Sequence, residues 1–228
     1  MITTMRQGVQ GLAEKAAVCS LLASVLLSAG CSSTAQLYGA QVIAEPTSAL
    51  LKTGDLERFG IAFVTPSTVT GQEEDKAALA LAFSQTLQQQ RPNIHVVPLA
   101  ETLTSVNRAG LFEEYLRMIT DYRQSGLLDP SALAQICKAT GTRYIALLNM
   151  ASFQQVYHDR LGIFGLRLLQ TKEANIRLTL QIWNSSDGSL AWEGSQEIHM
   201  ASETAAESAV SFGSVVQAAA DKLIVKIP

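Results

Sequence analysis

An alternation of apolar and polar side chains in residues 176–200 restricts the fold of this chain more than any other pattern. Apolar residues occupy every second position from Ile176 to Ile182, as expected for a strand with one buried face. An Asp-Gly pair at residues 187–188 is typical of a tight hairpin turn. The apolar face then continues from Leu190 to Met200. Two antiparallel strands packed on a core are therefore predicted here.

The two tryptophans of this hairpin are predicted to differ in environment. Trp192 shares the apolar face with Leu190, whereas Trp183 follows Ile182 directly. Neighbouring residues of a strand point to opposite faces of the sheet. We therefore expect Trp192 in the core and Trp183 directed away from it.

The remaining pattern predicts helices between short buried strands. Residues 73–90 repeat apolar side chains at intervals of four, which is typical of an amphipathic helix, and Asp129-Pro130 has the form of a helix start. We predict an α/β fold with a mixed sheet of about five strands flanked by helices, in the order β-α-β-α-α-β-β-β-α. The expected elements are strands at 58–66, 93–99, 143–158, 173–184 and 189–200, and helices at 73–90, 112–126, from 130, and at about 203–225.

Several segments together resemble a known domain of the bacterial envelope. They are "IAFVTPS", "ALALAFSQTLQQ", "LDPSALAQICKATGTRYIALL" and "LTLQIWNSSDGSLAWEGSQE". The domain is shared by the curli-secretion channel lipoprotein, the amino-terminal domain of TolB and the penicillin-binding-protein activator lipoproteins, and a similar one occurs in an exopolysaccharide-export lipoprotein. The resemblance covers roughly residues 57–226 and contains no catalytic signature. It implies a scaffold more than a function.

The amino-terminal stretch "LLASVLLSAGCSST" predicts export and lipid attachment. Residues 16–29 are uncharged and follow Arg6 and Lys15, which is the layout of a signal peptide. Leu27 to Cys31 looks like the lipobox of bacterial lipoproteins, although Ser28 stands where leucine is usual. This implies removal of residues 1–30 and acylation of Cys31, and Ser32 in place of aspartate is typical of the outer-membrane class. The alternative is an ordinary signal peptide followed by a buried cysteine.

The domain organisation follows from the same stretch. Residues 1–30 are the signal peptide, residues 31–56 contain the lipidated Cys31 and mainly a tether, and residues 57–228 form the periplasmic α/β domain. Within the tether, residues 38–44 and 49–51 have the alternative of docking on the domain or on a neighbour. Cys137 would be the one unmodified cysteine of the mature chain, and its helical apolar stripe predicts that it is packed in the core.

Charge and motifs exclude several functions. The whole chain has a formal charge of −3, and its basic residues are scattered, which argues against nucleic-acid binding. It has no phosphate-binding glycine loop and no nucleophile elbow. His95, His158 and His199 lie far apart in sequence, in no spacing typical of metal ligands. We therefore expect no catalytic residue, no metal and no cofactor, and predict that the chain is not an enzyme.

Residues 157–172 combine apolar and basic side chains where polar turn residues are expected. Leu161, Ile163, Phe164 and Leu166 are the interface candidates, and Arg160 and Arg167 flank them. We interpret the segment as a loop between strands that contacts a partner or another copy. The alternative is that the loop folds over the sheet edge and forms a small core of its own.

These observations predict an outer-membrane lipoprotein whose periplasmic domain is a non-enzymatic binding or regulatory part of an envelope assembly. Its expected partners are the membrane, through the lipid anchor, and an envelope protein, with a homo-oligomer as a further possibility. One alternative is an oligomeric component of polysaccharide or protein export. The other is a small-ligand receptor or an enzyme, for which the sequence offers no polar constellation.

Overall fold

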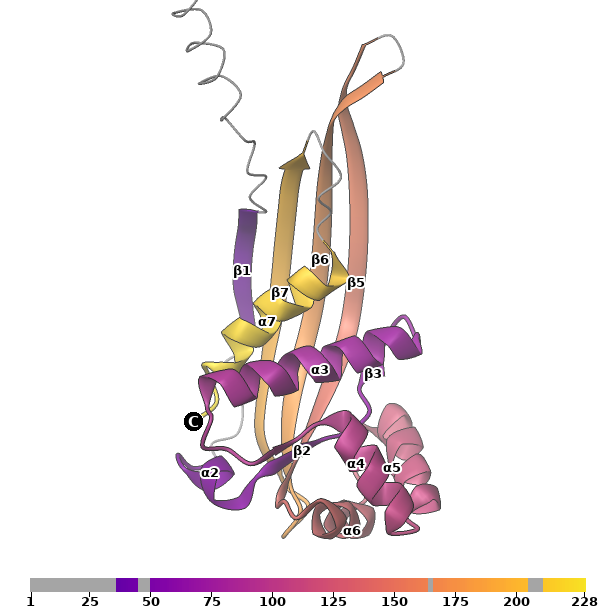
Figure 1. Cartoon of the computed structure of the whole chain (residues 1–228), viewed down its shortest axis with the longest axis vertical. Coiled ribbons are helices and arrows are strands. Elements are labelled where there is room, and N and C mark those ends of the chain that lie inside the picture. Colours follow the sequence, from indigo (N-terminus) through magenta and orange to yellow (C-terminus); the bar gives the residue numbers. More distant parts are fainter. Residues whose placement is uncertain (1–35, 45–49, 164–165, 205–210) are drawn as a thin grey trace, which may run out of the picture. The chain divides into compact units, whose positions relative to one another are not determined.

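The computed structural model describes residues 36–44, 50–163, 166–204 and 211–228; for 36–44, 157–163, 166–172 and 201–204 the description is of the backbone. Figure 1 shows a sheet whose lower half is packed among helices and whose central strands continue upward into a long hairpin. The strands are β1 (Gln36–Ala44), β2 (Ile61–Phe63), β3 (Ser67–Thr68), β4 (Val96–Val97), β5 (Tyr144–Ile163), β6 (Leu166–Asn184) and β7 (Leu190–Thr204). The helices are α2 (Asp55–Phe59), α3 (Glu73–Gln90), α4 (Leu99–Arg108), α5 (Phe112–Ser125), α6 (Pro130–Thr140) and α7 (Phe212–Ile224).

The predicted α/β class and the mixed sheet are confirmed. The strand order is β1-β7-β6-β5-β2-β4, with β3 beside β5. The pairs β2–β4, β2–β5 and β3–β5 are parallel, whereas β5, β6, β7 and β1 form an antiparallel series. The sequence interpretation missed β1, β3, α2 and α4, and it began the last helix too early, since β7 runs to Thr204 and α7 starts at Phe212.

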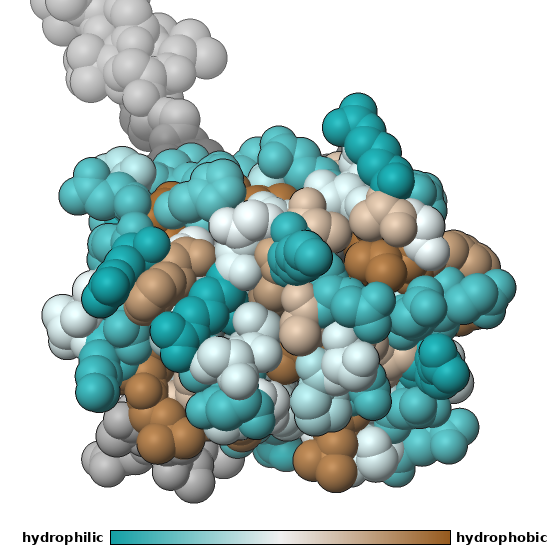
Figure 2. Space-filling model, turned by 90° about the horizontal axis from the view of Figure 1, so that it is seen from below, coloured by the Kyte–Doolittle hydropathy of each residue, from teal (hydrophilic) through white to brown (hydrophobic). Residues whose placement is uncertain are grey.

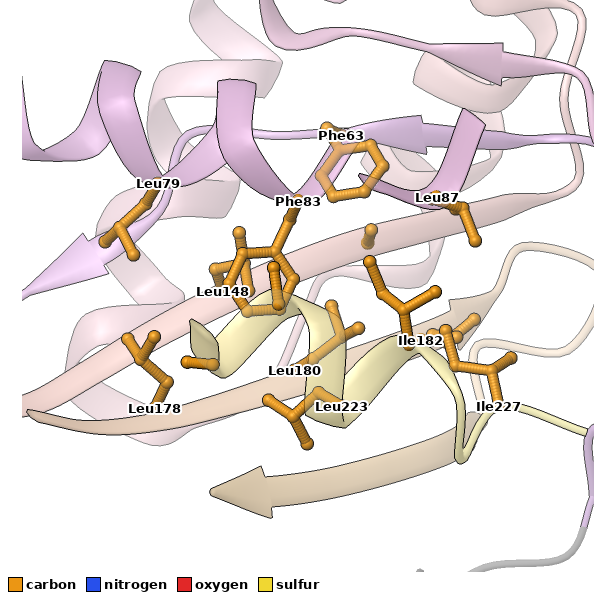
Figure 3. Packing of buried hydrophobic residues seen from close by; sticks show 14 of the residues in the cluster. Phe63, Leu79, Phe83, Leu87, Leu148, Leu178, Leu180, Ile182, Leu223 and Ile227 are labelled. Atoms are coloured by element: carbon orange, nitrogen blue, oxygen red, sulfur yellow. The ribbon is translucent and has the colours of Figure 1, made fainter. Parts of the chain in front are cut away.

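One face of the sheet carries the larger core, beneath α3 and α7. The apolar residues from Ile176 to Ile182 lie on this face, as their alternation predicts, and all of them are buried. Figure 3 shows Phe83 of α3 and Leu223 of α7 directed toward the same strands. Trp192 also belongs to this cluster and is 1% exposed. Burial of the apolar face by these two helices therefore stabilises the central strands.

The opposite face is also buried, but only near the start of β5. Ile145 and Leu147 pack there against residues of α5 and α6. Trp183 joins this second cluster and is 5% exposed. The two tryptophans do differ in environment, as predicted, but our expectation that Trp183 lies away from a core is wrong. The alternation correctly placed Trp183 on the face opposite the larger core. That face is covered by α5 and α6, which are distant from Trp183 in sequence.

Helix α6 forms where its sequence predicted. The side chain of Asp129 accepts a hydrogen bond from the backbone N–H of Ala132 at 2.7 Å, and Pro130 occupies the first turn. Gly141 ends the helix with φ at 69°, a conformation that glycine adopts without strain. Cys137 on this helix is 2% exposed, so its predicted packing in the core is confirmed. Burial raises the pKa of its thiol.

Part of the expected tether belongs to the sheet. Residues 36–44 form β1 and pair antiparallel with β7, from Gln36 opposite Ala201 to Ala44 opposite Ser195. The prediction of a tether up to residue 56 is therefore wrong for this segment, and the alternative of docking holds for it. The physical reason is that β1 supplies hydrogen-bonding partners to an edge of β7 that would otherwise lack them. Leu51 is buried as well, and its N–H donates to the carbonyl of Ala191 at 3.0 Å.

Candidate functional site

The predicted contact segment is a strand extension and not a loop. Strands β5 and β6 remain paired as far as Ile163 opposite Leu166. Leu161 and Ile163 lie in β5 and Leu166 lies in β6, whereas Phe164 falls outside the described residues. The interpretation as a loop is wrong, and the segment contains β-branched and aromatic residues such as Tyr157, Ile163 and Thr171, which favour strands. Its role in binding stays a prediction, as does acylation of Cys31, which also lies outside the described residues.

The uncovered part of the sheet presents a row of polar side chains, here called the polar face. It consists of Arg177, Thr179, Ser195, Glu197 and His199, on β6 and β7. These residues alternate with the buried residues of the larger core, so they point to the opposite side of the sheet. No helix among the described residues packs over this row, because α5 and α6 cover only the neighbouring end of the sheet.

Glu197 is the centre of the polar face. Its carboxylate accepts hydrogen bonds from Arg177 at 3.0 Å and from Asn175 at 3.4 Å, and the Nε2 atom of His199 lies 3.2 Å away. The hydrogen bond from Arg177 holds the pKa of Glu197 below its ordinary value. Thr179 and Ser195 share a hydrogen bond of 2.8 Å in the next row. The polar face therefore has a fixed pattern of donors and acceptors that a partner can recognise.

The polar face meets the second core through Gln181. The hydroxyl of Tyr122 on α5 donates to Oε1 of Gln181 at 3.0 Å, and the indole N–H of Trp183 donates to the same oxygen at 3.2 Å. The amide of Gln181 donates to Glu193 at 2.5 Å. Burial, with a smaller effect of the Glu193 charge, raises the pKa of Tyr122. These contacts fix the boundary between the covered and the open parts of the sheet.

The end of the molecule opposite the hairpin has a different surface. Figure 2 views that end, where hydrophobic side chains occur in small groups separated by polar ones. Exposed apolar residues of this region include Phe112 and Leu116 on α5 and Leu127 after it. Isolated apolar side chains are common on protein surfaces and do not by themselves indicate a binding site.

The described residues form no evident catalytic constellation. None of them form a group of three or more His, Cys, Asp or Glu that would hold a metal ion. His95 follows the turn before β4 and His199 lies on β7, so the structure does not bring these two together. No helix within the described ranges has the length and apolar character needed to cross a membrane.

Another polar cluster, at the turn of the β6–β7 hairpin, has a structural role. The guanidinium of Arg143 lies 4.7 Å from the centre of the Phe59 ring and donates to Asn184 at 3.0 Å and to Ser186 at 2.8 Å. Asn184 and Ser186 belong to the end of β6 and the turn after it, so Arg143 attaches that turn to the start of β5. Hydrogen bonds from Ser189 lower the pKa of Asp187 in the same turn. Each of these contacts supports the turn itself.

Comparison with known proteins gives partial structural likenesses. The PelC dodecamer from Paraburkholderia phytofirmans matches with a TM-score of 0.48 and 13% identity, over 83% of this chain and 98% of that chain. Lipoprotein GNA1162 from Neisseria meningitidis matches with a TM-score of 0.39 and 13% identity, over 72% of this chain and 97% of that chain. No protein-family model and no curated protein matches the chain. Likenesses at these TM-scores assign neither a family nor a function.

Proposed function

We propose that this chain is a lipid-anchored protein of the bacterial envelope whose α/β domain is a non-enzymatic binding component of an envelope assembly. The anchor is Cys31, and Ser32 favours the periplasmic face of the outer membrane. The observation that carries the proposal is the position of β1. This strand begins at Gln36, only five positions after Cys31, and is paired into the sheet. The anchor is therefore connected almost directly to the folded domain.

Acylation is tested by metabolic labelling with palmitate. Cys31→Ser should abolish the label and leave the signal peptide uncleaved, because the thiol of Cys31 is the proposed acceptor. Cys19→Ser is the matched control, since Cys19 lies within the segment that would be removed, and this variant should be labelled as the parent is. Normal labelling of Cys31→Ser would overturn the anchor.

For the protein partner, we propose the polar face as the recognition surface. It is an open sheet surface with an ordered carboxylate, a guanidinium and hydroxyl groups, which suits a polar protein interface. A photo-crosslinking residue at position 179 or 195 should yield adducts in cells. The same residue at Arg117, which is exposed on α5, should yield none. Adducts at Arg117 together with none at 179 and 195 would contradict this assignment.

An oligomeric component of an export system is the second candidate. The observation that favours it is that β1 stands at one end of the strand order, so that one of its edges is unpaired within the described sheet. Such an edge is able to pair with a strand of another copy. Mass photometry of the detergent-purified protein distinguishes the candidates, because a closed ring supports the oligomer and a monomer supports an adaptor.

A further inference from the structure

We propose that the distal hairpin, defined as residues 157–163 of β5 and 166–172 of β6, contacts the bilayer that holds the acyl chains of Cys31. The inference rests on the lipid anchor of the proposed function and adds to it a second membrane contact, which is made by the fold. The occupant of this surface is a lipid bilayer, and contact with another protein is an outcome of the test below.

The strand register places the end of the sheet relative to the anchor. Gln36 of β1 is opposite Ala201 of β7, Ala201 is opposite Glu173 of β6, and Glu173 is opposite Val156 of β5. Strand β5 continues beyond this row to Ile163. At about 3.3 Å per residue, the distal hairpin extends roughly 20 Å past the first residue of β1. Figure 1 shows the hairpin rising beyond β1.

The anchor enters at the same end of the sheet. Strand β1 runs from Gln36, near the hairpin, to Ala44, which pairs with Ser195 nearer the helices. The chain from Cys31 to Gln36 spans at most about 17 Å when fully extended. The acylated residue therefore lies no farther than about 17 Å from Gln36, which is similar to the distance by which the hairpin extends past Gln36. A bilayer that contains the acyl chains lies within reach of the distal hairpin.

The composition of the distal hairpin suits a bilayer surface. Its cross-strand neighbours include Leu161 with Leu169 and Ile163 with Leu166. It contains three basic residues and one acidic residue, whereas the rest of the chain from residue 31 onward contains 12 basic and 18 acidic residues. Aliphatic side chains favour the acyl region, and Arg and Lys are attracted to anionic headgroups. The acidic remainder of the chain would be repelled by such a surface, which favours an orientation with the hairpin toward the membrane.

The distal hairpin extends past the helices that pack on the sheet (Figure 1). Before the hairpin, Phe153 of β5 packs against Phe212 of α7, with ring centres 5.0 Å apart. Strand β7 pairs with β6 only up to Thr204, which is opposite Gln170. Figure 1 shows the paired strands β5 and β6 rising beyond the ends of α3 and α7. The aliphatic residues of such a hairpin would gain free energy by entering a bilayer that is already near.

Depth-dependent fluorescence quenching tests the proposal with the full mature protein. The new cysteine of Ile163→Cys or Leu161→Cys is labelled with an environment-sensitive fluorophore, since Cys137 is buried and Cys31 is acylated in the proposal. Leu116→Cys is the matched control, because Leu116 is aliphatic and exposed on α5. Each protein is reconstituted in vesicles of phosphatidylethanolamine and phosphatidylglycerol that contain brominated acyl chains.

We expect the labels at 161 and 163 to lose severalfold more emission than the label at 116. Equal emission in brominated and ordinary vesicles at both hairpin positions would overturn the proposal. So would crosslinks from these positions to a second polypeptide without quenching, because they indicate a protein interface. If one labelled variant does not fold, Leu169→Cys reports on the same row of the hairpin, since Leu169 is opposite Leu161.

The mass of the amino-terminal peptide separates failure of this inference from failure of the anchor. An acylated protein with unquenched hairpin labels overturns the hairpin contact alone. A protein without acyl groups whose labels are still quenched overturns the anchor and supports the contact.

Ile163→Glu with Leu166→Glu should abolish quenching of the label at 161, whereas Phe112→Glu with Leu116→Glu should leave it unchanged. Unchanged quenching in the variant with Ile163→Glu and Leu166→Glu would contradict an apolar contact with lipid.

Discussion

The two ends of the central strands are made of similar residue types but have different surroundings. Near the start of β5, Ile145 and Leu147 are buried by α5 and α6 on one face, while Ala146 and Leu148 are buried beneath α3 and α7 on the other. At the far end, Leu161 and Ile163 belong to the part of the β5–β6 hairpin that extends past the helices (Figure 1). Aliphatic residues at the first end stabilise the domain, and we propose that those at the second end contact a bilayer.

The difference shows that aliphatic strand residues acquire their role from what covers them. A domain buries its apolar strands beneath helices that the same chain provides. A hairpin that extends past those helices must find another apolar environment or remain exposed. In our proposal, the bilayer that holds the acyl chains of Cys31 supplies that environment.

The sharpest contrast between the two ends is expected from Trp192→Ala. Trp192 is 1% exposed in the larger core, so its removal should lower the free energy of unfolding by about 3 to 5 kcal/mol. Its buried indole N–H has no hydrogen-bond partner, which favours the lower part of that range. Chemical denaturation measures the change. Val156→Ala, at a position 44% exposed at the base of the hairpin, should change the same quantity by less than about 0.5 kcal/mol. Equal effects of the two substitutions would remove the contrast.

Gly194→Ala tests the packing within the covered part. A β-carbon at this position would collide with the Trp192 ring, chiefly its Cη2 atom, and would also approach Leu223. The expected loss is about 1 to 3 kcal/mol, which is typical of overpacking in a core. Thermal unfolding of the two proteins checks it. Gly71→Ala is the control without a steric clash, because a β-carbon at this position meets nothing within 4 Å. Its φ of 68° adds backbone strain. If Gly194→Ala is as stable as the parent, the Trp192 ring is able to move away from the added β-carbon.

Tyr122→Phe tests the boundary between the covered and the open parts of the sheet. The substitution removes the hydrogen bond from the Tyr122 hydroxyl to Gln181 and leaves the ring in place. We expect a loss of about 1 kcal/mol in the free energy of unfolding, as for one partly buried hydrogen bond. Thr120→Val on the exposed side of the same helix provides the comparison. A loss in that control as large as in Tyr122→Phe would indicate a general effect on α5.

The smallest effect is expected for Arg177→Gln on the polar face. The pKa of Glu197 is lowered mainly by its hydrogen bond from Arg177, so this pair contributes stability above the ordinary carboxyl pKa. The contribution is lost as the pH falls through the folded pKa of Glu197. Arg177 is half exposed, so solvent screens the pair and the change in stability should be slight. An NMR titration should show the pKa of Glu197 moving upward in the variant. An unchanged pKa would show that Arg177 is not its main cause.

Local patterns predicted the elements whose periodicity is strong. The interval of four in residues 73–90 matches α3, and the alternation in residues 176–182 matches the buried face of β6. The Asp-Gly pair lies in the turn between β6 and β7, where Gly188 has φ at 71°. Short elements such as β3 and α2 were missed, because two to five residues contain too little periodicity to be recognised.

The candidate site was predicted less completely, because its members are brought together by pairing between distant segments. Arg177 and Glu197 lie on different strands, and only the register of β6 against β7 places them opposite each other. The polar half of the alternation was visible in the sequence, but the absence of a helix above it was not. Similarly, β1 was hidden in a stretch without a sustained period, since its strand form depends on the edge of β7.

By itself, the sequence determined the α/β class, the resemblance of Cys31 and its neighbours to a lipidation signal, and the alternation that defines the larger core. These properties depend on residue types at short spacing, because the backbone geometry of a strand or helix places such residues on one face. The tertiary structure decided that a second set of helices buries Trp183, that β1 joins the sheet five positions after Cys31, and that the hairpin extends beyond the helices. Each of these depends on contacts between segments far apart in the chain, and no local pattern specifies which segment will cover which.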